Sequence, residues 1–502
     1  MDTKNPISFL TRFLVSLCIL SSLTRFRVGS IPAAATTQQQ LLSGFTATPN
    51  PSISTFQSLL VDSTGNYSLG FLRVNKVQLT LAVIHLPSSE SLWVANPTTP
   101  AKWTEDTRVF FHGSLVISDQ HAGVLWSTGT LGGDRVSLSN TSNLVITRNG
   151  SDSIVWQSFD FPSDTLMENQ NFTSAMSLVS SNGLYSMRLG SDFMALYARF
   201  SLRSDPDQIY WKHGALQAKA QVIDGRGPVS LVLSSDGYLG MYQNSSIPVD
   251  VQSFNTFQQS GHGIRRVRIE PDGNLNGYYW TGLNWVLDYQ AISDPCELPS
   301  ACGSYGLCQP GNGGCSCIDN RTSYSSGGCG LPENNDNSGD FCGNNNKYWG
   351  LRKQGVELPY KELMGYSKMG SLGECESACE ENCTCWGAVY SNSSGFCYTV
   401  DYPVQTLLEV SDVSRVGYFK VREEGAGKKG GGGHNRRVGI GLLFVGVVLV
   451  FGVVVGLGLC RVRSSKRKRG VGGYVEEDGG VNVGPYKDLG AASFRSIELC
   501  ER

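Results

Sequence analysis

Short alternating runs of apolar and polar residues dominate the chain from about residue 42 to residue 285. Typical runs are 67–71, 77–85 and 91–95, and Gly, Asn, Asp and Ser separate one run from the next. Alternation with a period of two residues is typical of strands that are buried on one face. Many short strands at such regular spacing predict an all-β fold of the barrel or prism kind.

Tryptophan recurs at a nearly constant interval in the first half of this β-rich region. Trp93, Trp126 and Trp156 are separated by 33 and 30 residues. The spacing predicts a threefold internal repeat whose tryptophans pack toward one shared core. Three unrelated core aromatics are the alternative interpretation.

Two further apolar runs lie near the ends of the chain. Residues 438–460 form a run of 23 residues without a charge, which is long enough to cross a bilayer as a helix. Residues 13–23 are also apolar; Lys4 and Arg12 precede them and small residues follow at 33–35, a pattern typical of a secretory signal peptide within residues 1–35. An uncleaved anchor is the alternative, but about 11 apolar residues are short for a span.

The charges beside the predicted span indicate its orientation. Arg461, Arg463 and the basic run 466–469 lie on its C-terminal side, as the positive-inside rule requires of the cytoplasmic side. We therefore expect a single-pass type I protein of the plasma membrane with an extracellular N-terminus. The cytoplasmic tail, residues 461–502, is too short for a catalytic domain, since small domains need about 50 residues or more.

Cysteine usage agrees with export. Twelve of the 15 cysteines lie in residues 296–397, and the other three are Cys18, Cys460 and Cys500. An even number in an extracellular segment implies disulfides, although spacing alone leaves their pairing open. Zinc is the alternative for such clusters, but no histidine lies close to them.

A helix is expected within the last cysteine group. Cys375, Cys379 and Cys383 recur every four residues across 374–382. On a helix, residues four apart share one face. All three cysteines would then face the same neighbouring element.

Eight Asn-x-Ser/Thr sequons all precede the predicted span. N-glycosylation requires surface loops of a secreted chain, so this distribution fits the expected topology. The sequons begin at Asn66, Asn140, Asn149, Asn171, Asn244, Asn320, Asn382 and Asn392.

Composition and motifs argue against several classes of function. A net charge of −2 gives no bulk attraction to nucleic acid. The chain has no Walker loop, no Gly-x-Ser-x-Gly elbow and no His-Glu-x-x-His motif, and its six histidines are scattered. We expect no enzymatic activity, no cofactor and no metal site.

Several longer strings resemble the bulb-type (G-type) lectin domain of plant S-locus glycoproteins and S-domain receptor kinases. They are NYSLGF at 66–71, LWVAN at 92–96 and above all WQSFDFPSDTL at 156–166. Residues 267–280 (VRIEPDGNLNGYYW) and the cysteines after them are similar to the S-locus glycoprotein region that leads into an EGF-like module. The string ENCTC at 381–385 is similar to an element of PAN/apple domains.

The resemblance implies a mainly β fold whose parts follow the family order. They are a bulb-type lectin β-prism (40–166), a second β-rich, lectin-like S-locus glycoprotein region (167–292), a disulfide-rich EGF-like module (293–330), a small α+β PAN/apple domain (342–422), a flexible stalk (423–437) and one transmembrane helix (438–460).

The resemblance also implies the disulfide pairing. It pairs Cys296–Cys308, Cys302–Cys315 and Cys317–Cys329 in the EGF-like module, pairs Cys375–Cys397 and Cys379–Cys385 in the PAN domain, and leaves Cys342–Cys383.

Lectins of this family bind mannose through the repeated pattern Gln-x-Asp-x-Asn-x-Val-x-Tyr, which is degenerate here. Aligned on Asn143 and Val145, the chain has Ser139, Thr141 and Thr147 where Gln, Asp and Tyr are needed. A polar site loses discrimination when its hydrogen-bonding groups are missing. We expect a structural lectin scaffold, so that any carbohydrate-binding residues remain unknown.

A second copy of the pattern around residues 114–116 is weaker still. The corresponding positions are Phe110, His112 and Ser118, so all three polar anchors are missing.

A third string resembles the sugar pattern superficially. Glu270, Asp272 and Asn274 have the right spacing, but Asn276 stands where Val is needed. The Asp-Gly-Asn sequence at 272–274 is typical of a hairpin turn, and a hairpin is the favoured interpretation.

The resemblance implies a receptor-like protein without a kinase, which recognises an extracellular peptide, glycan or partner receptor as a co-receptor or decoy. Family members dimerise through their ectodomains, so we expect a receptor kinase of the same family as a partner, in a homo- or heterodimer. A membrane-tethered lectin at the cell wall interface, which binds carbohydrate without signalling, is the alternative.

Overall fold

The computed structural model describes most of the chain between residues 38 and 422. The described ranges are 38–148, 153–200, 207–215, 228–243, 246–259, 263–311, 313–319, 324–325, 328–329, 341–342 and 348–422. They belong to the first of two compact units, Met1–Gly425. No helix within these ranges is both long and apolar enough to span a membrane. The predicted signal peptide, stalk, span and tail (1–35 and 423–502) lie outside the described residues.

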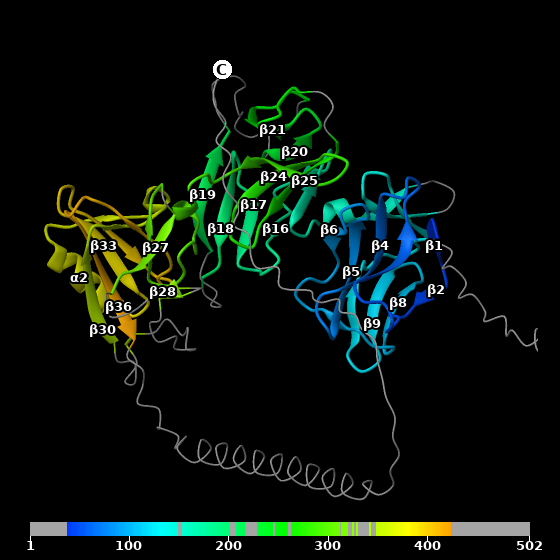
Figure 1. The fold of residues 1–502 in the computed structure, drawn as a ribbon, viewed down its shortest axis with the longest axis horizontal. Coiled ribbons are helices and arrows are strands. Elements are labelled where there is room, and N and C mark those ends of the chain that lie inside the picture. The colour runs from blue at the N-terminus through cyan, green and yellow to red at the C-terminus, as the bar shows by residue number, and fades with distance from the viewer. Residues whose placement is uncertain are drawn as a thin grey trace, which may run out of the picture. The chain divides into compact units, whose positions relative to one another are not determined.

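Three antiparallel sheets form the first β domain, residues 40–157, drawn in blue and cyan in Figure 1. Their strand orders are β3-β4-β5-β6 with β7 beside β5, β2-β8-β9-β10, and β1-β11-β12-β13. The inward-facing residues of all three sheets build one core, as Leu69, Ile117 and Ile146 illustrate. The strands are β1 (Gln40–Leu42), β2 (Phe45–Ala47), β3 (Phe56–Val61), β4 (Tyr67–Arg73), β5 (Gln78–His85), β6 (Glu90–Val94), β7 (Ala101–Lys102), β8 (Thr107–Phe111), β9 (Leu115–Asp119), β10 (Gly123–Ser127), β11 (Arg135–Leu138), β12 (Leu144–Thr147) and β13 (Ile154–Gln157).

The second β domain, residues 165–290, also consists of three antiparallel sheets. Their orders are β16-β17-β18-β19, β15-β20-β21-β22 and β14-β23-β24-β25, and they share a second core. The 3₁₀ helix η2 (Ser158–Asp160) lies between the two domains in the chain. The strands are β14 (Thr165–Met167), β15 (Asn171–Phe172), β16 (Leu178–Val179), β17 (Tyr185–Leu189), β18 (Phe193–Ala198), β19 (Gln208–Gly214), β20 (Ser230–Ser234), β21 (Tyr238–Tyr242), β22 (Asp250–Ser253), β23 (Arg265–Ile269), β24 (Leu275–Trp280) and β25 (Trp285–Gln290).

The two β domains follow the same chain path. In each domain the first three strands along the chain, here called leading strands, belong to three different sheets. Three meanders of consecutive antiparallel strands follow them. The leading strands join the meanders in reverse order: β1 pairs with the last meander, β2 with the middle one and β3 with the first, and β14, β15 and β16 repeat this arrangement. The first and last strands are therefore tied into one sheet, which closes each domain on itself.

The three repeated tryptophans meet in the core of the first β domain, as predicted. Their ring centroids are 5.8 Å (Trp93–Trp126), 5.9 Å (Trp93–Trp156) and 6.1 Å (Trp126–Trp156) apart, and all three pairs are edge-to-face. Each ring comes from the closing strand of a different sheet, namely β6, β10 and β13. This confirms the shared core and rejects three unrelated aromatics.

A β-bulge lies next to each of these tryptophans. On β6, Trp93 pairs with Val83, but the next pair is Ser91 with Ile84, so Leu92 is an extra residue. The same shift occurs beside Trp126 on β10 and Trp156 on β13. A bulge bends its strand and redirects a side chain, so the bulges turn the three rings toward one another.

The cysteine-rich module (residues 293–329) and the C-terminal domain (residues 348–422) share a sheet. Its order is β27-β26-β35-β31, and β26 runs parallel to β35 of the C-terminal domain. The elements in this sheet and beside it in the module are η3 (Pro295–Glu297), β26 (Gly306–Gln309), β27 (Gly314–Cys317), β28 (Tyr324–Ser325), β29 (Gly328–Cys329), β31 (Val356–Glu357) and β35 (Leu407–Glu409).

A five-stranded sheet and one α-helix complete the C-terminal domain. The sheet order is β30-β36-β33-β34-β32, and α2 lies beside it (Figure 1). The elements are β30 (Tyr348–Gln354), η4 (Lys361–Leu363), β32 (Ser367–Lys368), α2 (Leu372–Glu381), β33 (Gly387–Ser391), β34 (Phe396–Val400) and β36 (Arg415–Arg422).

Six disulfides occur here, three within the cysteine-rich module and three that involve the C-terminal domain. They are the six pairs that the family resemblance implies. Cys375 and Cys379 are buried on α2, whereas the helix ends at Glu381 and Cys383 lies in the turn after it. No cluster of metal-ligating side chains occurs among the described residues. The disulfides join Cys296–Cys308, Cys302–Cys315, Cys317–Cys329, Cys342–Cys383, Cys375–Cys397 and Cys379–Cys385.

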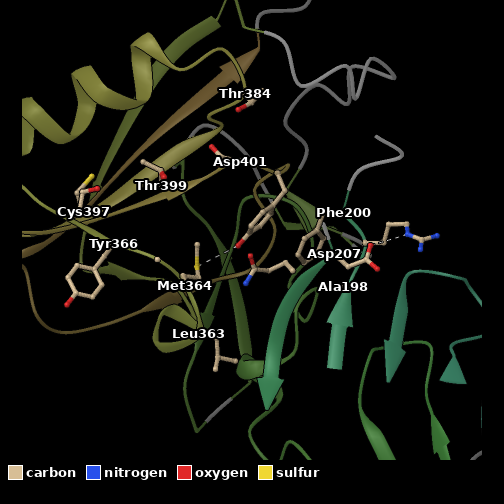
Figure 2. Close-up of a pocket in the computed structure, with 15 residues that line it drawn as sticks. Ala198, Phe200, Asp207, Leu363, Met364, Tyr366, Thr384, Cys397, Thr399 and Asp401 are labelled. Carbon is tan, nitrogen blue, oxygen red and sulfur yellow. Dashed lines mark hydrogen bonds and ion pairs between the residues drawn. The ribbon is translucent and has the colours of Figure 1, made fainter. Parts of the chain in front are cut away.

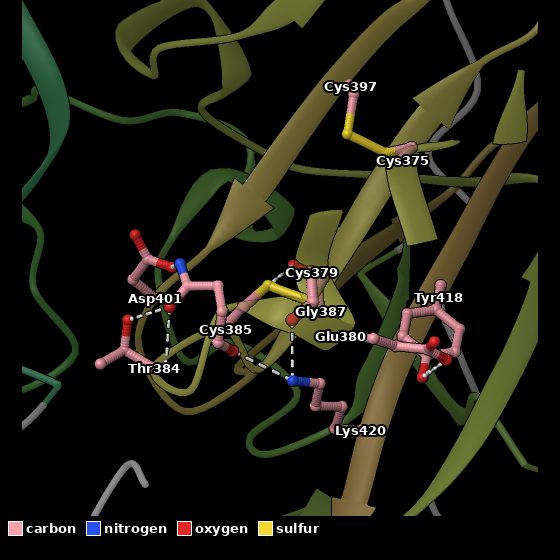
Figure 3. The surroundings of a disulfide bond; sticks show 11 residues. Cys375, Cys379, Glu380, Thr384, Cys385, Gly387, Cys397, Asp401, Tyr418 and Lys420 are labelled. Atoms are coloured by element: carbon pink, nitrogen blue, oxygen red, sulfur yellow. Dashed lines mark hydrogen bonds between the residues drawn. A yellow bond between two sulfur atoms is a disulfide. The ribbon is translucent and has the colours of Figure 1, made fainter. Parts of the chain in front are cut away.

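A buried lysine holds the C-terminal end of α2 against the sheet (Figure 3). Lys420 on β36 is fully buried, and its Nζ donates to the carbonyl oxygens of Cys379 at 2.8 Å and Asn382 at 3.1 Å. The rings of Phe341 and Tyr348 lie within 5.1 Å of the ammonium. Helix C-terminal carbonyls lack intrahelical partners and carry partial negative charge. Lys420 therefore acts as an internal C-cap, although burial lowers its pKa.

Removing one of the packed tryptophans should destabilise the first β domain. We expect Trp156→Ala to cost about 3–5 kcal/mol in the free energy of unfolding, because it leaves a cavity among three sheets. Urea denaturation followed by far-UV circular dichroism measures the change. The matched control is Leu131→Ala, since Leu131 is 88% exposed and should change stability by less than about 0.5 kcal/mol. Equal effects of the two substitutions would contradict a shared tryptophan core.

Replacing the buried lysine should destabilise the C-terminal domain. Lys420→Met keeps most of the side-chain volume but removes both hydrogen bonds of the ammonium, so we expect a loss of about 1–3 kcal/mol. Thermal unfolding under non-reducing conditions measures it. Lys368→Met is the control, because Lys368 is exposed on the edge strand β32. A variant as stable as the control would show that the capping bonds contribute nothing.

Candidate ligand-binding site

The degenerate sugar motif of the first β domain uses its one matching polar residue structurally. The Asn143 Nδ2 donates to Gln157 Oε1 at 2.8 Å, and Asn143 Oδ1 accepts from the Ser158 hydroxyl and the Phe159 amide, both at 3.2 Å. These bonds tie β12 to β13 and η2. The side chain is therefore already engaged within the domain.

The other motif positions of this loop also bond to one another. The Ser139 hydroxyl lies 2.7 Å from the Thr141 hydroxyl and accepts from the Asn143 amide at 3.1 Å. Thr147 Oγ1 accepts from the Arg135 guanidinium at 2.9 Å. The loop closes on itself through short hydroxyl side chains, which reach less far than the Gln, Asp and Tyr of the sugar pattern.

The positions of the weaker copy lie on β8 and β9 and in the turn between them. Phe110 pairs with Val116 across the two strands, and Ser118 pairs with Arg108. The His112 ring bonds to the Ser43 hydroxyl at 3.1 Å. These residues serve the sheet and its neighbouring loop, and they form no cluster of sugar-binding groups.

The third string forms the predicted hairpin between β23 and β24. The Asn274 side chain donates to the Ile292 carbonyl at 2.7 Å and accepts from the Ile292 amide at 3.1 Å. The Tyr278 hydroxyl donates to Glu270 at 2.8 Å, and burial raises the pKa of Tyr278 to about 12. Two of the groups that could hold a sugar are thus bonded to each other, and a third is bonded to the backbone.

A groove of about 610 Å³ opens between the second β domain and the C-terminal domain (Figure 2). Its walls come from the end of β18, the start of β19, the segment after η4 and the strand β34. The lining combines aromatic rings, carboxylates, hydroxyls and an amide. The residues are Ala198, Arg199, Phe200, Asp207, Gln208, Leu363, Met364, Gly365, Tyr366, Ser367, Thr384, Cys397, Thr399, Asp401 and Tyr402.

Stacked and hydrogen-bonded rings hold the two walls of the groove together. Phe200 stacks on Tyr402 with a centroid distance of 4.7 Å. The Tyr402 hydroxyl donates to the Tyr360 hydroxyl at 3.1 Å, and Tyr360 belongs to the core of the second β domain. Burial raises the pKa of both phenols, so both stay neutral. The groove therefore has a rigid aromatic side.

Acidic and hydroxyl groups form the more polar side. Asp207 pairs with Arg188 and, at 3.2 Å, with Arg199. Across the groove, the Asn382 side chain donates to Asp401 at 3.4 Å and accepts from the Thr384 hydroxyl at 2.8 Å. In Figure 2 Asp207 and Asp401 stand on different walls. The opening also exposes the Tyr366 ring, which is 56% accessible.

This groove is a feature that the sequence analysis missed. Its walls come from residues within 198–200, 207–208, 363–367 and 384–402, which are far apart in the chain. The predicted sequon at Asn382 lies beside it, but that motif concerns glycosylation. No local pattern in the sequence signals a site of this kind.

The predicted glycosylation sites that the structure describes are all on the surface. Asn66, Asn140, Asn171, Asn382 and Asn392 are exposed. Asn149, Asn244 and Asn320 lie outside the described residues. Use of any of these eight sequons stays a prediction.

Two family models match parts of the chain. A D-mannose binding lectin model matches residues 91–188, and an S-locus glycoprotein domain model matches residues 238–321.

Known proteins match over longer stretches. A PAN domain-containing protein of Arabidopsis thaliana is 51% identical over 466 residues, which cover 92% of each chain. A G-type lectin S-receptor-like serine/threonine-protein kinase of the same plant is 27% identical over 383 residues, which cover 69% of this chain but only 42% of the kinase. Among solved structures, a two-domain lectin, Scilla campanulata agglutinin, aligns with 51% of this chain and 94% of its own at 18% identity, with a TM-score of 0.19.

The protein should fail to bind mannose through the family motif. We expect no retention on immobilised mannose, because the matching asparagine is engaged internally and its partners are replaced. A bulb lectin with intact motifs is the positive control. The triple variant Ser139→Gln, Thr141→Asp, Thr147→Tyr tests whether the missing groups are the reason. Retention of the unmodified protein that free mannose competes away would contradict the prediction.

Proposed function

Since the chain belongs to the plant family of S-domain (G-type lectin) receptor-like proteins with a PAN domain, we propose that it is a cell-surface receptor-like protein. In this proposal it spans the plasma membrane once and recognises an extracellular ligand or a partner receptor. It acts as a co-receptor or decoy, and any signal that it transmits depends on the kinase of a partner.

The groove between the second β domain and the C-terminal domain is the observation that carries this proposal. Its aromatic side offers Phe200, Tyr366 and Tyr402, residue types that anchor protein interfaces. Its polar side offers Asp207 and Asp401, and hydroxyl and amide groups complete the lining. A mixed surface of this kind suits an extended peptide or a protruding loop of a partner protein better than a single sugar ring.

The state of the sugar-motif residues supports recognition of a protein. The side-chain amides of Asn143 and Asn274 both donate hydrogen bonds within the protein. The lectin-like fold therefore serves as a scaffold that places the groove, rather than as the binding surface itself.

The receptor kinases among its relatives suggest the partner. Their alignments cover 66–78% of this chain but less than half of each kinase. A protein that resembles the extracellular part of a kinase-bearing receptor is well placed to pair with one. We therefore propose a receptor kinase of the same family as its partner.

The tethered lectin remains the second candidate. The match to the D-mannose binding lectin model favours it. A glycan array discriminates between the two. Binding that a free sugar competes away would favour the lectin, and an array without signal would favour a protein ligand.

Substitutions in the groove should weaken partner binding. We expect the double variant Leu363→Ala, Tyr366→Ala to recover at least about tenfold less receptor kinase after crosslinking and purification from plant membranes, because anchor side chains contribute about 1–2 kcal/mol or more each. Val413→Ala is the control, since Val413 is exposed in the same domain but does not line the groove. Membranes that yield no receptor-type kinase would count against the proposal, and undiminished recovery with the groove variant would place the contact elsewhere.

A further inference from the structure

The two β domains meet through a compact polar and aromatic contact, which we call the joint. The first domain contributes the β5–β6 hairpin, with His85, Ser88 and Glu90, and the second contributes β23, β24 and β25. Arg266 bonds to Glu90, and the Trp285 Nε1 donates to the Ser88 hydroxyl at 3.0 Å. These contacts are independent of the groove.

Two arginines and two carboxylates carry the charge of the joint, and the second carboxylate is Asp164, which lies 3.8 Å from the Arg268 Nε. Both Arg266 and Arg268 pair with Glu90, and Arg268 also donates to the Ser91 carbonyl. The Arg266 guanidinium is only 3% exposed and lies 4.1 Å from the Trp285 ring centroid and 5.2 Å from that of Tyr278. Glu90 is 40% exposed. The most buried charge of the joint is therefore that of Arg266, whose carboxylate partner is partly in water.

His85 is buried in the middle of this contact. Its ring lies 4.7 Å from Trp280, 5.4 Å from Trp285 and 5.6 Å from Tyr67, between centroids. It is 2% exposed. Two of these three rings belong to the second domain, so His85 is enclosed only while the joint is closed.

The hydrogen bonds at Ser88 favour a neutral imidazole. The Ser88 oxygen accepts from the Trp285 indole and, at 3.4 Å, from the Glu90 amide. A hydroxyl oxygen has two lone pairs and one proton. With both lone pairs taken, its proton is left for His85 Nδ1, which lies 2.9 Å away. A proton on Nδ1 would remove this bond.

The surroundings of the His85 ring also favour its neutral form. Burial, and next to it the charge of Arg266, lower the pKa of His85, and Glu90 opposes them. The other titratable neighbour is Tyr67, whose pKa burial raises to about 12, so it stays neutral. Its own neighbours Asp62 and Glu168 contribute to that increase.

We propose that His85 makes the joint between the two β domains acid-sensitive, so that protonation of its ring favours an open arrangement. Opening would expose His85 to water and remove it from Arg266, the two tryptophans and the Ser88 bond. Opening therefore lowers the free energy of the protonated ring and raises that of the neutral ring. The joint is thus a proton-dependent switch on the relative placement of the domains.

The direction with pH follows from linkage. Because the pKa of His85 is lower in the closed joint than in water, the open state binds more protons and gains population as the pH falls through the usual histidine range, about 6.5, toward the closed-state value. Glu270 works in the opposite sense: burial raises its pKa, so its protonation favours the buried state. The Glu270 carboxylate accepts a hydrogen bond from Tyr278 and lies near Arg266 and Arg268. Its contribution to the pH response must therefore be separated from that of His85.

Hydrogen exchange on the full chain in detergent micelles tests the proposal. After correction for intrinsic rates, peptides covering β5–β6 and β24–β25 should exchange severalfold faster at about pH 5 than at about pH 7.5. Peptides covering β8–β9, which are remote from the joint, serve as the internal reference. His85→Phe keeps an aromatic ring and should abolish the difference. His121→Phe, at an exposed histidine of the same domain, should leave it intact.

Two further variants keep the test decisive. Ser88→Ala removes the hydroxyl that favours the neutral ring, so the midpoint of the response should move to higher pH even if the phenylalanine variant folds poorly. Glu270→Gln should enlarge the response or leave it unchanged. A response that persists in His85→Phe, that is absent from the unmodified protein, or that disappears only in Glu270→Gln would overturn the proposal.

Discussion

The first β domain depends on the contact among three tryptophans, each on the closing strand of one of its three sheets. A three-sheet domain has no single continuous sheet, so its sheets must be joined through side chains. Trp93, Trp126 and Trp156 do this, because a bulge beside each one turns its ring to the common centre. Large aromatic surfaces in edge-to-face contact supply both burial and a fixed geometry. The degenerate sugar motif lies outside this centre, in the turn before β12 and on β12 itself.

The second β domain keeps the chain path but replaces the aromatic centre. Trp211 on β19 and Tyr289 on β25 take the positions beside the bulges, and Gln252 on β22 bonds to both Tyr289, at 3.5 Å, and His213. His213 in turn pairs with Asp250 at 2.6 Å. A polar network of this kind specifies geometry but contributes less burial than three tryptophans. The second domain also makes contacts with both of its neighbours, with the first β domain at the joint and with the C-terminal domain at the groove.

Much of the fold could be predicted from the sequence, and much less of the sites. Period-two alternation and the tryptophan interval depend on neighbours within one sheet or one repeat, and so they predict strands and a shared core. The disulfide pairs came from family resemblance, since spacing left them open. Other features depend on residues far apart in the chain: the pairing of β26 with β35, the approach of Phe200 to Tyr402, and the enclosure of His85 by Trp280. No local pattern specifies such contacts, which is why the groove and the joint were not foreseen.

The buried cations explain why the joint can open while the cores stay closed. Lys420 satisfies its ammonium with two carbonyl oxygens and two rings, and Arg265 pairs at 2.6 Å with Asp288, which is itself 1% exposed. Arg266 is less completely paired: its Nε and Nη1 have no hydrogen-bond partner among the described residues, compared with Nη2 alone in Arg265, and its carboxylate partner is partly in water. Burying a cation with incomplete partners costs free energy that opening would return. The contact between the two domains therefore already holds an incompletely paired cation, and a proton on His85 would place a second positive charge beside it.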